Sequence, residues 1–139
     1  MVQEGAAPIR LNAAVPQFTV PDLVRTAEYY RDVLGFQIAG FWDGEQTTST
    51  PTIPPSFAVV WRDDIEIFFN RATGPVKRER APGAYDVYVR VTGVDALVAE
   101  LIRRGAEIVD GPGDRMYEQR EVVVRDCNGL ILAFGEPSS

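Results

Sequence analysis

Residues 15–36 read VPQFTVPDLVRTAEYYRDVLGF, and residues 87–112 read VYVRVTGVDALVAELIRRGAEIVDGP; these two stretches decide the fold. Each begins with an extended run in which apolar and polar residues alternate, as in a β-strand with one buried face. Each then continues into a segment whose apolar residues recur every three or four positions, as on one side of a helix. The chain therefore contains the same strand-to-helix unit twice.

The ends of both predicted helices are marked by local signals. The first helix is predicted over 22–34, with Asp22 as its N-cap, and the second over 94–104. A glycine, Gly35 or Gly105, closes each helix, and these two glycines are 70 residues apart in the chain. An offset of this size is too long for a solenoid repeat and indicates that a whole module has been duplicated.

Three further extended runs follow each predicted helix. They are QIAGFW (37–42), FAVVW (57–61) and IEIFFN (65–70) in the first half, and AEIVD (106–110), EVVVR (121–125) and LILAF (130–134) in the second. The chain thus predicts an α+β fold, a single domain of two βαβββ modules at about 12–71 and about 84–136. The connector at 43–55 is long and rich in turn formers, so we expect it to form a lid or a rim.

Composition excludes several classes of function. The chain has 139 residues, 45% of them hydrophobic, a net charge of -6, no histidine and one cysteine, Cys127. Without histidine it lacks Ser–His and Cys–His nucleophile pairs, and the acidic balance argues against nucleic acid as a partner. No stretch reaches the roughly 18 consecutive apolar residues of a membrane span, and the N-terminus does not resemble a signal peptide. We therefore expect a cytoplasmic protein that contacts no membrane and uses no cofactor.

Alternation along the strands separates two faces of the predicted sheet. One face is uniformly apolar and is predicted to lie under the helices: Phe18, Val20, Ile65, Ile67, Phe69, Val87, Val89, Val91, Leu130, Leu132 and Phe134. The opposite face mixes aromatic and polar residues: Gln17, Thr19, Glu66, Phe68, Asn70, Asp86, Tyr88, Arg90, Ile131 and Ala133. Such a mixture is typical of a ligand pocket, but an ordinary solvent-facing sheet surface has it as well.

The two quoted stretches, together with REVVVRDCNGLILAF at 120–134, resemble the vicinal oxygen chelate superfamily, which contains glyoxalases, extradiol dioxygenases and bleomycin-resistance proteins. The resemblance extends from Ala14 to Glu136. It implies two βαβββ modules whose eight strands form a cup-shaped mixed sheet, usually in a homodimer. The likeness is greatest to metal-free bleomycin-resistance proteins, through AVPQFTVPDL and the FAVVWRDDIEIFF hairpin, whereas Cys127 replaces the proline usual in the final turn.

Metal-using members of this superfamily place one ligand on the first and one on the fourth strand of each module. The resemblance puts Val15, Phe68, Asp86 and Ala133 at these positions. Of the four, Asp86 alone carries a donor, and a single carboxylate does not fix a transition ion. We therefore expect no metal site and none of the metal-dependent activities of the superfamily.

These observations favour a protein that binds an antibiotic-like, aromatic and cationic small molecule by sequestration, without catalysis. The candidate ligand-binding residues are Trp42, Phe57, Trp61, Glu66, Phe68, Asp86, Tyr88, Arg90 and Tyr117, with Phe41 as a further aromatic candidate. Aromatic faces attract stacked rings and cations, and carboxylates orient a ligand amine. The ligand is expected in the cup or at the interface of a homodimer.

Other interpretations of the same residues remain open. The aromatic side chains can pack in the core or at an interface, and Glu66 and Arg90 can pair with each other. A metal-independent enzyme acting on a small metabolite would use Glu66 or Asp86 as a general base, its basicity raised by apolar neighbours. A third possibility is an interaction module whose cup is filled by its own loops.

Overall fold

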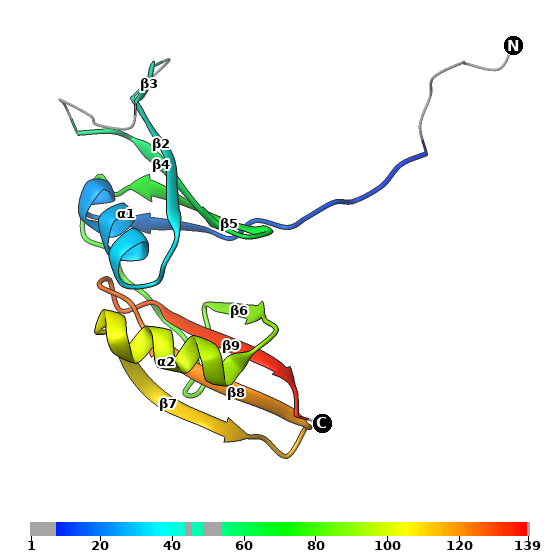
Figure 1. Cartoon of the computed structure of the whole chain (residues 1–139). Helices are drawn as coiled ribbons and strands as arrows, with labels where there is room; N and C mark the ends of the chain where they lie inside the picture. The colour runs from blue at the N-terminus through cyan, green and yellow to red at the C-terminus, as the bar shows by residue number, and fades with distance from the viewer. Residues whose placement is uncertain (1–7, 44–45, 49–53, 139) are drawn as a thin grey trace, which may run out of the picture.

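The computed structural model describes residues 8–43, 46–48 and 54–138. Figure 1 shows the strands and helices of these ranges in the order that the sequence predicts, with β3 as an additional strand. Their bounds are β1 (Gln17–Val20), α1 (Leu23–Asp32), β2 (Gln37–Asp43), β3 (Gln46–Thr48), β4 (Phe57–Arg62), β5 (Ile65–Arg71), β6 (Val87–Arg90), α2 (Val94–Arg104), β7 (Glu107–Asp114), β8 (Gln119–Arg125) and β9 (Ile131–Pro137).

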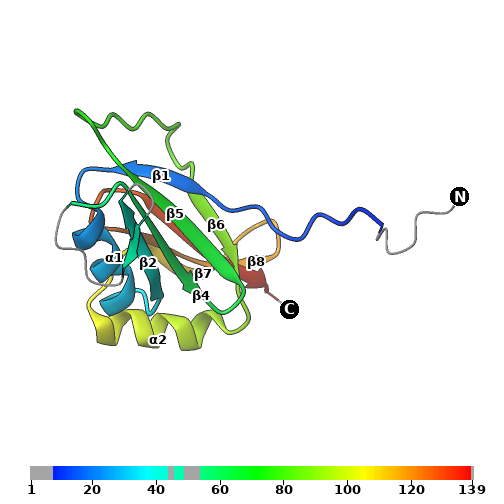
Figure 2. The ribbon, with the colours of Figure 1, turned by 90° about the horizontal axis from the view of Figure 1, so that it is seen from above.

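The two modules have the same topology. The first sheet has the order β1-β5-β4-β2-β3 and the second the order β6-β9-β8-β7. In each module the first strand pairs in parallel with the last, and the remaining pairs are antiparallel. Figure 2 shows β1 and β5 side by side. The predicted α+β class and the doubled βαβββ order are confirmed.

The helix ends follow the predicted signals except at the end of α1, which stops at Asp32 with Val33 as its C-cap, before the predicted end at Leu34 and Gly35. The Asp22 side chain accepts a hydrogen bond from the backbone N–H of Arg25 at 3.0 Å and so caps α1. At the end of α2, Gly105 adopts φ 81° and closes the helix. Part of the predicted lid at 43–55 lies outside the described residues, but its residues 46–48 form β3, which extends the first sheet beyond β2.

The apolar faces of both sheets form one continuous core. Val20, Ile67 and Phe69 of the first sheet are fully buried in the same cluster as Leu132 and Phe134 of the second. The helix-covered face predicted from alternation is therefore confirmed, with Phe18, Ile65, Val87 and Val91 packed at its margin.

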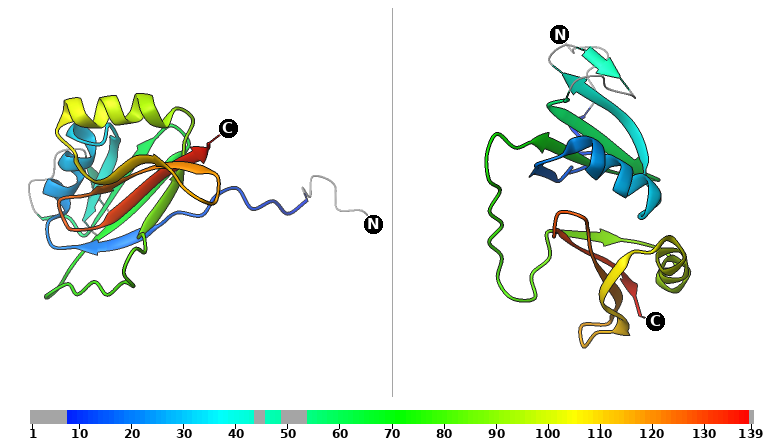
Figure 3. Two further views of the ribbon diagram at one scale, coloured as in Figure 1. Left: turned by 90° about the horizontal axis from the view of Figure 1, so that it is seen from below. Right: turned by 90° about the vertical axis from the view of Figure 1, so that its left-hand side faces the viewer.

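The modules pack through these helix-bearing faces, seen as an upper and a lower layer in the right-hand view of Figure 3. The hydroxyl of Tyr30 on α1 donates to Asp126 in the β8–β9 turn at 2.6 Å. Arg62 at the β4–β5 turn donates to Glu100 on α2 at 2.7 and 3.0 Å. Each helix thus contacts the other module.

This packing changes one detail of the predicted architecture. The strands form two separately hydrogen-bonded sheets instead of one continuous eight-stranded cup. Because the helix-bearing faces meet in the core, the opposite face of each sheet lies on the outside of the chain. We call these the first outer face, on the first sheet, and the second outer face, on the second sheet.

Candidate functional site

Three aromatic side chains lie together on the first outer face. Trp42 near the end of β2 and Phe57 at the start of β4 are cross-strand partners, with ring centroids 5.8 Å apart. Phe57 in turn contacts Phe68 on β5 with a centroid separation of 5.3 Å, and both pairs are edge-to-face. All three rings are half-buried, so they remain open to a ligand. We call these three residues the aromatic cluster.

Trp61 and Glu66 lie on the same face but further along the strands. They are cross-strand partners on β4 and β5, and Trp61 is half-buried whereas Glu66 is exposed. Trp61 lies four positions after Phe57, which is about 13 Å along a strand. Trp61 therefore does not belong to the aromatic cluster, and Glu66, two residues before Phe68, lies level with Trp61.

Phe41 is not part of this surface. Its side chain is 2% exposed and packs in the core cluster with the residues under α1. This agrees with the core packing that the sequence left open for it, and it removes Phe41 from the candidate ligand contacts.

The second outer face is centred on a buried carboxylate that the sequence analysis did not identify. Glu121 on β8 is 0% exposed. It accepts hydrogen bonds from the hydroxyls of Tyr117 at 2.5 Å, Tyr88 at 2.6 Å and, at the longer distance of 3.4 Å, Tyr85. Arg115 also donates to it at 3.2 Å. We call these five residues the tyrosine–glutamate network.

Hydrogen bonds within the network shift the pKa values of Glu121, Tyr88 and Tyr117. Burial would raise the pKa of Glu121, but the hydrogen bonds from Tyr117, Tyr88 and Arg115 outweigh it and hold this pKa below its ordinary value. Burial and the hydrogen bond to Glu121 raise the pKa of Tyr88 to about 12. The pKa of Tyr117 is raised by its own bond to Glu121. Glu121 is therefore ionised and saturated with donors, and Tyr88 and Tyr117 keep their protons.

The geometry of the network also limits what it can bind. The tyrosine hydroxyls converge on the carboxylate, so the ring edges and not the ring faces surround it. Tyr85, Tyr88 and Tyr117 are nevertheless 37%, 37% and 53% exposed, which leaves their outer ring surfaces available for contact. The second outer face thus presents aromatic surface around a charge that is already neutralised.

Asp86 has a structural role. Its Oδ2 accepts a hydrogen bond from Arg80 at 2.5 Å and another from the backbone N–H of Ile131 at 2.8 Å. Arg80 also donates to the carbonyl of Gly129 at 3.1 Å, so it ties the connector between the modules to the β8–β9 turn. Asp86 is therefore engaged by its own chain before any ligand arrives.

The structure separates several residues that the sequence grouped in one cup. Glu66 lies on the first sheet, whereas Asp86, Tyr88, Arg90 and Tyr117 belong to the second module. Within the part of the chain that the structure describes, Glu66 and Arg90 form no ion pair, so the pairing that the sequence left open does not occur there. The general-base hypothesis placed Glu66 and Asp86 among apolar neighbours, but Glu66 is exposed and Asp86 is ion-paired.

The donor set does not fit the metal that many superfamily members use. Phe68 stands in the aromatic cluster, Ala133 is fully buried without a donor atom, and the carboxylate of Asp86 is bound to Arg80. Among the described residues no three His, Cys, Asp or Glu side chains gather in a way that could hold a metal ion. The positions that would carry the metal therefore lack its ligands.

One signal for the network was present in the sequence. Successive side chains of EVVVR point to opposite faces of the sheet, so Glu121 and Val123 point to the outer face and Val122 points to the core. A glutamate on a strand is nevertheless usually solvent-exposed. The three tyrosines and Arg115 that bury it come from the segment before β6, from β6 itself and from the β7–β8 hairpin, and periodicity does not show such contacts.

The comparisons with known proteins identify the class. Residues 10–134 match the model of the Glyoxalase/Bleomycin resistance protein/Dioxygenase superfamily, and the chain belongs to this superfamily. The resemblance stated from the sequence is confirmed.

Individual relatives agree with this assignment. The chain is 25% identical over 122 residues to the virulence protein STM3117 of Salmonella typhimurium, covering 85% of this chain and 78% of that protein. The crystal structure of TioX from Micromonospora sp. ML1 matches with a TM-score of 0.67 at 22% identity, over 88% of this chain and 96% of TioX. The crystal structure of UcmS2 matches with a TM-score of 0.62 at 20% identity, over 93% of this chain and all (100%) of UcmS2. These structural matches show the fold.

Neither helix in the described ranges combines the length and the apolar character that crossing a membrane requires.

Proposed function

We propose that this chain is a metal-free binding protein that sequesters an aromatic, cationic, antibiotic-like small molecule in the cytoplasm. The observation that carries the proposal is the aromatic cluster of Trp42, Phe57 and Phe68, half-buried on an outer sheet face. Its member Phe68 stands at a position where metal-using relatives would place a metal-ligating residue, and the chain has no histidine. A stacked ring or cation gains about 0.5–2 kcal/mol on each such aromatic face.

Charge supports a cationic ligand. The chain carries a net charge of -6, which attracts cations to its surface. Glu66 is exposed on the first outer face, two residues from Phe68 and therefore about 7 Å away along the strand. Glu121 is saturated by its own donors, so Glu66 is the carboxylate that would orient a ligand amine beside the aromatic cluster.

A homodimer would complete this site. The two outer faces of one chain do not face each other, and both expose aromatic surface. In a twofold dimer, the first outer face of one protomer can meet the second outer face of its partner, and symmetry repeats the contact. The extended segment before β1 offers further apolar surface, because Ile9 and Leu11 are 95% and 93% exposed (Figures 1 and 2).

Calorimetric titration with bleomycin and with acridine-type cations tests the proposal. Trp42→Ala and Phe68→Ala are expected to weaken binding about fivefold to tenfold each, because each removes one stacking surface worth about 1 kcal/mol. Ile102→Ala is the control, since Ile102 is an exposed apolar side chain on α2, outside the first outer face. Equal affinity of wild type, Trp42→Ala and Phe68→Ala for every probe that binds would refute the stacking site.

A further inference from the structure

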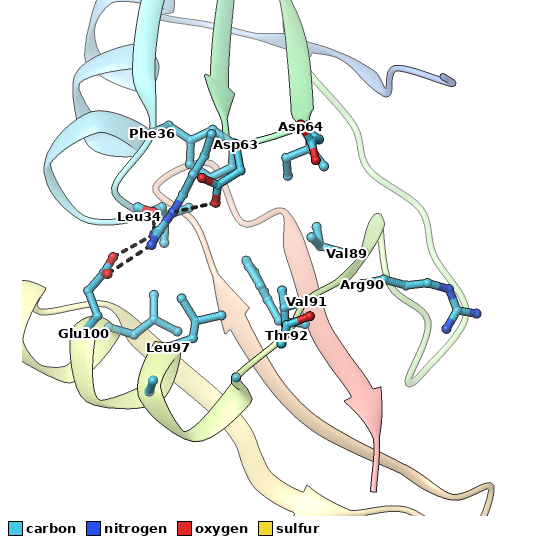
Figure 4. A pocket seen from close by; sticks show the side chains of 16 residues that line it. Leu34, Phe36, Asp63, Asp64, Val89, Arg90, Val91, Thr92, Leu97 and Glu100 are labelled. Carbon is cyan, nitrogen blue, oxygen red and sulfur yellow. Dashed lines mark hydrogen bonds and ion pairs between the residues drawn. The ribbon is translucent and has the colours of Figure 1, made fainter. Parts of the chain in front are cut away.

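A cavity lies between the two modules, away from both outer faces. It has a volume of about 460 Å³ and lies between the β4–β5 hairpin and α2 (Figure 4). The Arg62–Glu100 pair is part of its lining, and Arg62 is further held by a hydrogen bond to the carbonyl of Leu34 at 2.9 Å. The volume falls within the roughly 300–1,000 Å³ that small-molecule pockets occupy.

Apolar side chains form a large part of the walls of this inter-module cavity. Ile65 from β5, Val89 and Val91 from the second module and Leu97 from α2 line it, and Phe134 lies among them. These residues belong to the helix-bearing faces, so the cavity is a gap at the edge of the core and is separate from the aromatic cluster. An occupant would gain about 25 cal/mol for each Å² of apolar surface that it covers.

The mouth of the cavity is acidic. Asp63 and Asp64 are consecutive at the tip of the β4–β5 hairpin, and Asp63 has 91% of its side chain exposed. The nearest cation to Asp63 is Nε of Arg62 at 3.9 Å, but the Arg62 guanidinium is already bound to Glu100. For Asp64 no ion pair occurs within the described ranges. Arg90 lies at the cavity edge, and Figure 4 shows its side chain extending away from the other lining residues.

We infer that the inter-module cavity binds an amphipathic aliphatic amine. The ammonium group sits between the carboxylates of Asp63 and Asp64, and the aliphatic body enters between Ile65 and Leu97. Arg62 and Glu100 neutralise each other, so they repel neither end of such a molecule. This site does not depend on the aromatic cluster or on dimer formation.

Titration of the ¹⁵N-labelled protein with n-octylamine tests the inference, with n-octanol and octanoate as neutral and anionic probes of equal length. The expected result is saturable shifts of the backbone amide signals of Ile65, Val91 and Leu97, with n-octylamine binding more tightly than n-octanol and octanoate most weakly. The amide signals of Trp42 and Phe57 are expected to stay in place, which distinguishes this site from the aromatic cluster.

Two variants test the contributions of the carboxylates and of the cavity volume separately. Asp63→Asn combined with Asp64→Asn is expected to weaken n-octylamine binding about fivefold to tenfold and to leave n-octanol binding unchanged, since two partly exposed ion pairs are lost. Leu97→Trp is expected to fill the cavity and abolish binding of all three probes. Leu97 is half-buried, so folding of this variant can be verified by its amide spectrum. Unchanged n-octylamine binding in both variants, or no saturable shift in the wild type, overturns the inference.

Discussion

The hydrogen bond between Tyr30 and Asp126 gives the sharpest test of how the two modules are held together. The Tyr30 hydroxyl donates to Oδ2 of Asp126 at 2.6 Å, and the two side chains come from different modules. Tyr30 is 0% and Asp126 5% exposed, so water cannot replace the lost donor. The other carboxylate oxygen, Oδ1, already accepts the backbone N–H groups of Asn128 and Leu130, each at 2.8 Å.

Tyr30→Phe removes the donor and leaves the packing. The ring keeps its edge-to-face contacts with Phe36 at 5.5 Å and Phe69 at 5.1 Å. The loss is therefore one buried hydrogen bond to a carboxylate, which costs about 2–3 kcal/mol of the free energy of unfolding. For a chain of this length that corresponds to a decrease in Tm of about 6–10 °C.

Urea unfolding followed by circular dichroism measures the difference, and Tyr29→Phe is the control. Tyr29 neighbours Tyr30 on α1, and its hydroxyl donates to the carbonyl of Arg125 in an exposed bond of 3.2 Å. Because water can replace that bond, Tyr29→Phe is expected to cost less than about 1 kcal/mol. If Tyr30→Phe is no more destabilising than Tyr29→Phe, the two modules are not held together by this contact.

The same pair gives a dependence on pH with a defined sign. Burial raises the pKa of Asp126, and the hydrogen bonds from Tyr30, Leu130 and Asn128 offset part of that rise. Protonated Asp126 therefore contributes stability. This contribution is complete below the pKa of Asp126 in the unfolded chain and is lost as the pH rises through its pKa in the folded protein. Tyr30→Phe raises the folded pKa further. The difference in the free energy of unfolding between wild type and Tyr30→Phe is therefore largest at neutral pH and becomes smaller as the pH falls toward about 4.

Three more substitutions test other parts of the structure. Gly111→Ala is expected to lower the free energy of unfolding in urea by about 3 kcal/mol or more, because its Cβ would lie 2.5 Å from a backbone oxygen at φ +81°. Gly105→Ala has the same φ but open space around it, so it is expected to lower the free energy of unfolding by about 1–2 kcal/mol. Equal losses in the two variants would contradict the reasoning. Glu121→Gln is expected to destabilise by about 2–3 kcal/mol and to lower the pKa of Tyr88 from about 12, which ultraviolet difference titration detects; an unchanged tyrosine titration would argue against the network. Glu100→Gln is expected to cost about 1 kcal/mol near neutral pH. The hydrogen bond from Arg62 lowers the pKa of Glu100. The stability that ionised Glu100 contributes is therefore present above its pKa in the unfolded state and is lost as the pH falls through its pKa in the folded state. Thermal unfolding at several pH values should show the Tm values of wild type and Glu100→Gln converging in acid.

The sequence predicted the local structure well because its signals are local. Asp22 caps α1 and Gly105 closes α2 in the positions that the pattern indicated, and alternation assigned Ile67 and Phe69 to the core. The same pattern predicted the doubled βαβββ order. The resemblance grouped Trp42, Phe57 and Phe68 among the candidate ligand contacts, and the structure brings these three together.

Contacts between distant segments could not be predicted in the same way. Tyr30 is fully buried, but its partner Asp126 is 96 residues away in the chain, and no local pattern links the two. Glu121 was missed because its donors, such as Tyr88 and Arg115, come from three separate segments. The cup implied by the resemblance also required knowledge of which sheet faces meet, and alternation distinguishes the two faces of a sheet without saying what each one packs against.

The packing through helix-bearing faces separates stability from binding in this chain. The contacts that join the modules, Tyr30 with Asp126 and Arg62 with Glu100, lie on the inner side of both sheets. The aromatic cluster lies on the first outer face and contributes no residue to the core cluster. Substitutions at Trp42 or Phe68 therefore change the binding surface and leave the inter-module contacts in place. Loss of ligand affinity in those variants, with the free energy of unfolding preserved, reports on the site itself.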